Sequence, residues 1–305
     1  MITANTVLIL GAGASKPYGF PTGRELLDII CREMGEETGA SVIMLQKTGR
    51  VGLDHIGRFR EHLFKSSKQS VDAFVERQPD FLEIGKLAIA QALLPLERHV
   101  KLIDICRRTD SWYQFLYNKM DYGFDEFGEN TLSILTFNYD RSLEEYLFTA
   151  LKYSYNRDDK ATKKVLRRIP IVHLYGQLSI HPAMSDDPSV IREYGANPSS
   201  FVKAAEGIKI ISELDPDDDE FKRARELLSK ADRVCFLGFG YDERNVKRLK
   251  VAAEGNRKVF GTTYKLGDGQ ILDAKKLLVG GKHKNLTLGS SKHDCYQFLT
   301  NVSVL

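Results

Sequence analysis

The feature that most constrains the fold is a short apolar run, Thr6–Leu10, which leads directly into the glycine-rich letters GAGAS at residues 11–15. An apolar run without polar alternation is typical of a strand that is buried on both faces of a parallel sheet. A helix is expected to begin at Thr22, because Thr22 and Glu25 have the spacing of a capping box. The segment therefore predicts a strand, a tight turn and a helix, in that order.

Similar apolar runs return in the second half of the chain and alternate with helical patterns. The expected strands lie at residues 132–136, 169–176, 233–238, 258–262 and 285–288, and the last three are separated by expected helices at 243–254 and 269–278. Strand–helix alternation of this kind produces parallel sheets. The expected fold class is therefore α/β, with a Rossmann-like parallel sheet that carries helices on both faces.

The region between the first two expected strands has a different pattern. From about residue 35 to residue 128 no buried strand is evident, and apolar residues recur at helical spacing, as in Ile84, Leu87 and Ala88. We expect residues 1–34 and 129–305 to form the Rossmann-like domain. Residues 35–128 are expected to form a helical insertion that packs over the ligand cleft.

Composition excludes several classes of protein. Of the 305 residues 42% are hydrophobic and 28% are charged, as in globular proteins. No apolar run reaches the roughly 18–20 residues of a membrane span, and no basic leader indicates a signal peptide. The net charge of +3 does not argue for nucleic-acid binding. The four cysteines are widely separated, which predicts no zinc site and favours a reducing cytoplasm: Cys31, Cys106, Cys235 and Cys295.

The turn at residues 11–15 is a candidate phosphate-binding site. Gly11 and Gly13 would allow the backbone to approach a pyrophosphate, and N–H groups near the helix start would hold the anion. A dehydrogenase is disfavoured, because Lys16 stands where the third glycine of GxGxxG would be. No second strand ending in an acidic residue follows about 20 residues later, where a dehydrogenase would hold the ribose. The alternative is an ordinary tight turn between strand and helix.

Three further motifs stand at expected carboxyl ends of strands, where ligands bind in open α/β sheets. Asn138 and Asp140, in TFNYD, could each offer a polar group to one small ligand, or could simply cap a helix. His173, in HLYG, could act as a general base near neutral pH, or could be a structural residue. Gly238 and Gly240, in LGFGYD, could approach the adenosine half of a dinucleotide, or form a plain turn.

The order and spacing of these four motifs resemble the sirtuin superfamily. In that family a phosphate turn, a nicotinamide pocket, a catalytic histidine and an adenosine-side loop follow one another as GAGxS, TxNxD, HxxG and LGxG do here. The resemblance covers about residues 4–32 and 130–265, and it implies a sirtuin-like fold that binds NAD. A weaker likeness, in SVDAF at residues 70–74, links the insertion to bacterial sirtuin-like proteins.

The departures from the sirtuin pattern indicate which group of sirtuin-like proteins the chain resembles. The four-cysteine zinc module is missing, the histidine motif has two residues before its glycine, and PTGR at residues 21–24 lacks the usual Phe-Arg. These differences resemble the bacterial sirtuin-like NAD-degrading effectors of anti-phage defence. The resemblance implies an NAD hydrolase that releases nicotinamide and ADP-ribose, with NAD as its substrate and no metal.

The resemblance also implies roles for individual residues. Asp140 would contact the nicotinamide carboxamide, Asn138 would hold the ribose or the attacking water, and His173 would be the base. Binding of the pyrophosphate and the adenosine half would fall to Gly11, Ala12, Gly13, Ser15, Gly238, Gly240 and Thr262.

Two other functions compete with the NAD hydrolase. One is a zinc-less deacylase or ADP-ribosyltransferase, which activity on an acyl-lysine peptide would separate from simple loss of NAD. The other is a subunit that binds NAD or ADP-ribose without turnover, and the joint presence of Asn138, Asp140 and His173 counts against it. The resemblance further implies a homo-oligomer, with a separately encoded ATPase or nucleic-acid-guided protein as a partner.

Overall fold

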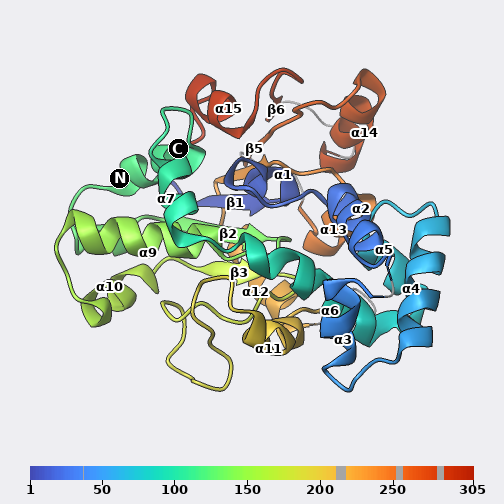
Figure 1. Cartoon of the computed structure of the whole chain (residues 1–305). Helices are drawn as coiled ribbons and strands as arrows, with labels where there is room; N and C mark the ends of the chain where they lie inside the picture. The colour runs from blue at the N-terminus through green and yellow to red at the C-terminus, as the bar shows by residue number, and fades with distance from the viewer. Residues whose placement is uncertain (37, 211–217, 252–256, 280–284) are drawn as a thin grey trace.

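The computed structural model describes residues 1–36, 38–210, 218–251, 257–279 and 285–305. Its centre is one sheet with the strand order β3-β2-β1-β4-β5-β6, in which every neighbouring pair is parallel (Figure 1). The strands are β1 (Thr6–Leu10), β2 (Leu132–Thr136), β3 (Ile171–His173), β4 (Arg233–Leu237), β5 (Lys258–Gly261) and β6 (Leu286–Leu288). The Rossmann-like α/β fold expected from the sequence is therefore confirmed.

β1 is the centre of the sheet and is buried along its whole length. Its middle residue, Leu8, pairs with Ile134 of β2 on one side and with Cys235 of β4 on the other. The chain adds β2 and β3 on one side of β1 and β4 to β6 on the other. The carboxyl ends of β1 and β4 therefore flank the topological switch point, which is where open α/β sheets bind ligands.

Helices cover both faces of the sheet (Figure 1). On one face α8 (Trp112–Met120) contacts both α9 (Ser142–Ser154) and α15 (Cys295–Asn301). On the other, α13 (Glu243–Leu249) contacts both α12 (Asp219–Ser229) and α14 (Asp268–Val279). The helix expected at 243–254 is shorter than predicted: it ends where Lys250 adopts a left-handed φ of 52°, and residues 252–254 lie outside the described residues.

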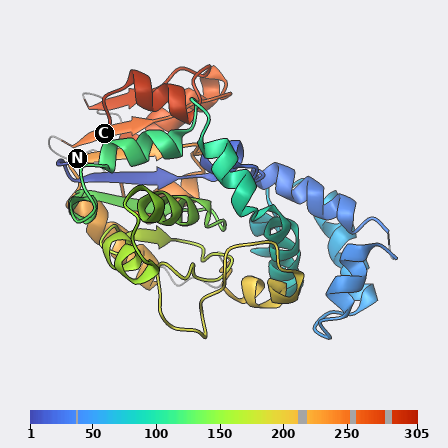
Figure 2. The ribbon, with the colours of Figure 1, turned by 60° about the vertical axis from the view of Figure 1, so that its left-hand side comes forward.

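Helices also occupy the stretch between β1 and β2, where the described residues contain no strand. Thr22 caps the first long helix and forms the expected capping box with Glu25. The helices before α8 are α1 (Ala12–Ser15), α2 (Gly23–Glu33), α3 (Ala40–Gln46), α4 (Leu53–Lys65), α5 (Val71–Val75), α6 (Leu82–Leu93) and α7 (His99–Cys106). Figure 2 shows the β1 arrow pointing toward the group formed by α2 to α6. This helical group therefore lies beyond the carboxyl ends of the strands.

The remaining helices are short or follow β2 and β3. They are α10 (Asp159–Leu166), α11 (Phe201–Glu206) and the 3-10 helices η1 (Lys16–Tyr18), η2 (Pro79–Phe81), η3 (Leu94–Leu96), η4 (Glu126–Glu129) and η5 (Pro198–Ser200). α11 packs on α6, so the segment after β3 joins the helical group. Among the described helices, none combines the length and the apolar character that a membrane crossing requires.

A buried ion cluster joins the helical group to the sheet domain. Arg141, just before α9, is 0% exposed and donates to both carboxylate oxygens of Glu97, at 3.0 and 2.8 Å. Arg192 donates to the same carboxylate at 2.5 Å, and its backbone carbonyl accepts from Arg141 at 2.7 Å. The three residues come from three separate stretches of the chain, so this cluster fixes how those stretches meet.

We predict that Glu97→Ala lowers the free energy of unfolding by about 3–5 kcal/mol, because it leaves two buried guanidinium groups without their carboxylate. The control is Glu83→Ala, which removes an exposed partner of Arg50 and should cost about 0–1 kcal/mol. Urea denaturation of both variants measures the difference. Equal losses in the two variants would contradict the structural role assigned to Glu97.

Candidate functional site

The turn after β1 and the turn after β4 are in direct contact. The amide groups of Gly11 and Gly13 donate to the carbonyls of Leu237 and Gly238, at 3.0 and 2.9 Å, and the amide of Ala14 donates to the carbonyl of Gly11. These three N–H groups are therefore used within the protein. We expected N–H groups at residues 11–15 to hold a pyrophosphate, but in this conformation these three are not available for that contact.

Three of the glycines are required by this contact. A Cβ on Gly11 would lie 2.6 Å from the carbonyl oxygen of Gly238. A Cβ on Gly13 would lie 2.8 Å from the carbonyl oxygen of Gly238. Gly238 itself has a φ of 56°, and a Cβ there would lie 2.0 Å from the amide nitrogen of Ala14. Thr262, at the end of β5, accepts a hydrogen bond from the amide of Gly238 at 2.8 Å. The sequence-predicted glycine motifs and Thr262 therefore form one packed platform, with Gly240 at its open side, where a Cβ would meet nothing within 4 Å.

Asn138 and Asp140 lie beside this platform, at the carboxyl end of β2. The Asn138 amide nitrogen donates to the Gly11 carbonyl at 3.0 Å and to the Ser15 hydroxyl at 2.9 Å. Ser15 and Asp140 line the same small cavity, and the Asp140 carboxylate accepts from the backbone amide of Ser142 at 3.2 Å. Asp140 is buried, and burial raises its pKa above the usual range. The structure thus brings Ser15, Asn138 and Asp140 together.

His173 joins the same cluster from the end of β3, but both of its ring nitrogens are occupied. Nδ1 lies 2.9 Å from the backbone carbonyl oxygen of Asn138, and Nε2 lies 2.6 Å from the Oε1 of Glu144. Burial disfavours the charged form of His173, yet the charge and hydrogen bond of Glu144 raise its pKa overall. Burial likewise opposes ionisation of Glu144, but His173 lowers the pKa of that carboxyl. The two residues form a buried hydrogen-bonded pair in which each favours the charged form of the other.

Aromatic residues cover the cluster. The indole N–H of Trp112 donates to the Ala14 carbonyl at 2.8 Å, and the Tyr113 hydroxyl lies 2.7 Å from that of Ser142. The rings of Tyr18 and Tyr113 stack with centroids 3.6 Å apart. Trp112 and Tyr113 begin α8, within the expected insertion, so that region does reach the predicted site.

The cluster encloses only a small cavity. Its volume is about 10 Å³, which is room for about one water molecule. The polar residues that line it are Ser15, Tyr113, Thr136, Asn138, Asp140, Glu144 and His173. The predicted catalytic and nicotinamide-side residues therefore meet at one point, in a conformation closed to a ligand of nicotinamide size.

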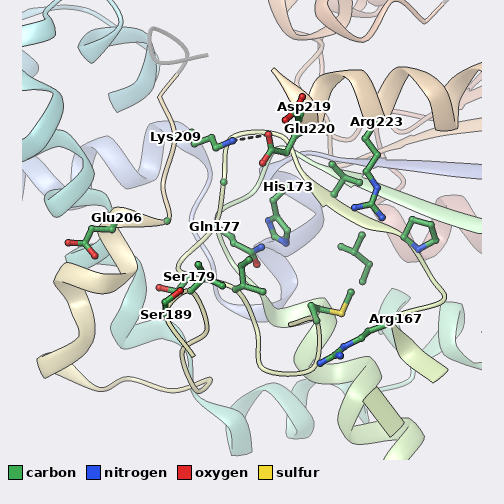
Figure 3. A pocket seen from close by; sticks show the side chains of 18 of the residues that line it. Arg167, His173, Gln177, Ser179, Ser189, Glu206, Lys209, Asp219, Glu220 and Arg223 are labelled. Carbon is green, nitrogen blue, oxygen red and sulfur yellow. Dashed lines mark ion pairs between the residues drawn. The ribbon is translucent and has the colours of Figure 1, made fainter. Parts of the chain in front are cut away.

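A second cavity, of about 720 Å³, lies along the free edge of β3 (Figure 3). It shares Ile171 and His173 with the small cavity. Figure 3 shows the Arg223 side chain of α12 reaching into it, on the side away from Glu206. This cavity could not be expected from the sequence, because it depends on how the segment after β3 folds back.

Glu144, Tyr113 and Ser142 also belong to this site, although no motif in the sequence marks them. Glu144 lies four residues after Asp140, on the first turn of α9, and an acidic residue there is usually explained by the helix dipole.

Among the described residues, no group of three or more His, Cys, Asp or Glu side chains is arranged to hold a metal ion. The four cysteines are buried and free.

We predict that Gly238→Ala destabilises the fold by at least about 1–3 kcal/mol, from the strain of a left-handed backbone alone. Gly240→Ala is the matched control two residues away, and its effect should stay within about 0.5 kcal/mol, because open space surrounds that position. Thermal and urea unfolding of both variants provide the measurement. A stable Gly238→Ala variant would show that the two turns do not need their close contact.

Comparison with known proteins identifies no family for this chain. No protein-family model matches the chain, and no curated protein matches it either. The sirtuin resemblance therefore stays a prediction that rests on the motifs and on the site.

Proposed function

We propose that the protein hydrolyses NAD at the bond between nicotinamide and ribose. The observation that carries the proposal is the meeting of Ser15, Asn138, Asp140 and His173 around one buried point. They come from the ends of β1, β2 and β3, beside the switch point of the sheet. Ligands bind at this position in Rossmann-like folds, which supports a dinucleotide as the substrate.

The reaction needs little help at the leaving group. The bond between ribose C1′ and the pyridinium nitrogen breaks, and its electron pair moves to that nitrogen to give neutral nicotinamide. A water oxygen bonds to C1′, and the water loses one proton to a base. The products are nicotinamide, ADP-ribose and a proton, so the reaction consumes no further reagent.

In this proposal the buried side chains have separate tasks. Asp140 accepts a hydrogen bond from the nicotinamide carboxamide, and Asn138 positions the ribose or the attacking water. His173 is the base, once a ribose hydroxyl or a water replaces Glu144 at its Nε2. Because the cavity has room for about one water, nicotinamide enters only when residues of the cavity wall move apart.

In the cell this activity would deplete NAD, as the resemblance to anti-phage effectors implies. A homo-oligomer, and a separately encoded ATPase or nucleic-acid-guided partner, belong to the same proposal. We also propose that the protein acts in the cytoplasm, where NAD is abundant. An acyl-lysine peptide tested in the same assay separates hydrolysis from deacylation.

A second candidate is a subunit that binds NAD or ADP-ribose without cleaving it. The observation that favours it is the closed state of the site: both nitrogens of His173 are occupied. Binding of NAD without release of nicotinamide, by calorimetry and product analysis on the same sample, would decide for this candidate.

We predict that His173→Ala and Asn138→Ala each reduce nicotinamide release by about 10²–10⁴-fold, because they remove the base and the group that positions the nucleophile. His62→Ala, an exposed histidine on α4, is the control and should retain full activity. Nicotinamide is measured by chromatography, with melting temperatures in parallel. An active wild type whose His173→Ala variant keeps most of the rate would refute the role of His173, and unfolding of that variant would make the histidine structural.

A further inference from the structure

The contacts of His173 determine where its protons are. A backbone carbonyl oxygen only accepts hydrogen bonds, so the 2.9 Å contact with Asn138 requires a proton on Nδ1. The 2.6 Å contact between Nε2 and the Oε1 of Glu144 requires one proton between the two atoms. His173 therefore has no free lone pair in this conformation. The nitrogen that could act on a substrate is the one that Glu144 occupies.

Glu144 is placed to occupy the Nε2 of His173. It is 2% exposed, lies on the first turn of α9, and lines the small cavity together with Asn138 and Asp140. Its neighbour Glu145 makes a pair of the same kind, with His181 at 2.7 Å and with His99, and takes no part in the cavity. Two consecutive glutamates thus hold different histidines, and only Glu144 faces the candidate site.

Other ionisable groups surround His173. In the small cavity it faces Asp140 and Tyr113. In the larger cavity the charged side chains include Arg167, Lys209, Glu220 and Arg223. Lys209 and Glu220 form an ion pair at 2.8 Å, and Arg167 pairs with Asp186 outside the cavity lining, so these charges are partly neutralised. Glu144 is the carboxylate in hydrogen-bond contact with the ring.

We propose that Glu144 is a positioning residue of the candidate site, which holds the proton between its Oε1 and the Nε2 of His173 and favours the cationic form of the histidine. The inference rests on the proposed NAD hydrolase activity and extends it. Glu144 orients the ring together with the Asn138 carbonyl. Before a substrate group replaces it at Nε2, Glu144 also sets the pH above which His173 of the free enzyme is neutral and available as a base, so its effect belongs to the pH profile of kcat/KM.

The direction of the pH effect follows from this hydrogen-bonded pair. Glu144 raises the pKa of His173 above its ordinary value, so the cation is present below that raised pKa and is lost as the pH rises through it. A base must be neutral before it accepts a proton. Nicotinamide release by the wild type should therefore rise with pH, with its midpoint above the ordinary histidine pKa of about 6.5.

The test compares Glu144→Gln with Glu145→Gln. The glutamine amide can donate to a neutral Nε2 but carries no charge, so Glu144→Gln should move the acidic limb of the pH profile down by about one to three pH units. Each unit corresponds to about a tenfold higher rate, relative to the plateau, in the range below both pKa values. Glu145→Gln removes the other buried pair and should leave the limb in place.

The second readout does not need activity. Nuclear magnetic resonance of ¹⁵N-histidine-labelled protein gives the pKa of His173 directly, with its signal assigned by its loss in His173→Gln. The pKa should fall in Glu144→Gln and stay unchanged in Glu145→Gln. If Glu144→Gln does not fold, Glu144→Asp keeps the charge on a shorter side chain and should lower the pKa part of the way.

The outcomes separate this inference from the proposed function. An unchanged His173 pKa in Glu144→Gln, or a pH limb that moves equally in both glutamine variants, would overturn the role of Glu144. A wild type that releases no nicotinamide would instead overturn the NAD hydrolase. In that case a lowered His173 pKa in Glu144→Gln would still establish that Glu144 controls this histidine.

Discussion

The contact between the turns after β1 and β4 is the constraint on which the candidate site depends. Gly13 and Gly238 touch through their backbones, so neither position has room for a side chain. This contact sets the position of Gly11, whose carbonyl oxygen accepts a hydrogen bond from Asn138. Through Asn138 it also reaches His173, which bonds the Asn138 carbonyl. A backbone contact at the switch point thus orders side chains at the ends of two further strands, β2 and β3.

A second feature of this structure is its set of buried carboxylates, each paired with a basic side chain. Glu144 pairs with His173, Glu145 with His181, and Glu97 with Arg141, all with little or no exposure. A buried carboxylate without a partner would be costly, and each of these is compensated by a basic side chain and by hydrogen bonds. Such pairs contribute modestly to net stability, but losing one partner is expensive. They therefore define how α9 meets the segments around it.

Much of the fold was predictable from local patterns. Thr6–Leu10 and Leu132–Thr136 are strands with the predicted bounds, because short apolar runs of this kind are typical of strands that a parallel sheet buries on both faces. The strand at 169–176 was predicted too long: β3 has only Ile171–His173, and the chain turns at Gly176, which has a φ of 67°. The clustering of Asn138, Asp140 and His173 was also predictable, since carboxyl ends of parallel strands share one edge.

What the sequence determined by itself is the order of strands and helices, and which polar residues stand at strand ends, since both follow from local periodicity and from glycine geometry. Tertiary structure alone decided the rest. It placed Tyr113 over the cluster, set Glu144 against Nε2 of His173, and used the amides of Gly11 and Gly13 for internal hydrogen bonds. These contacts join residues from about 30 to more than 200 positions apart in the chain, or turn a helix-end glutamate inward, and no local pattern encodes such a pairing.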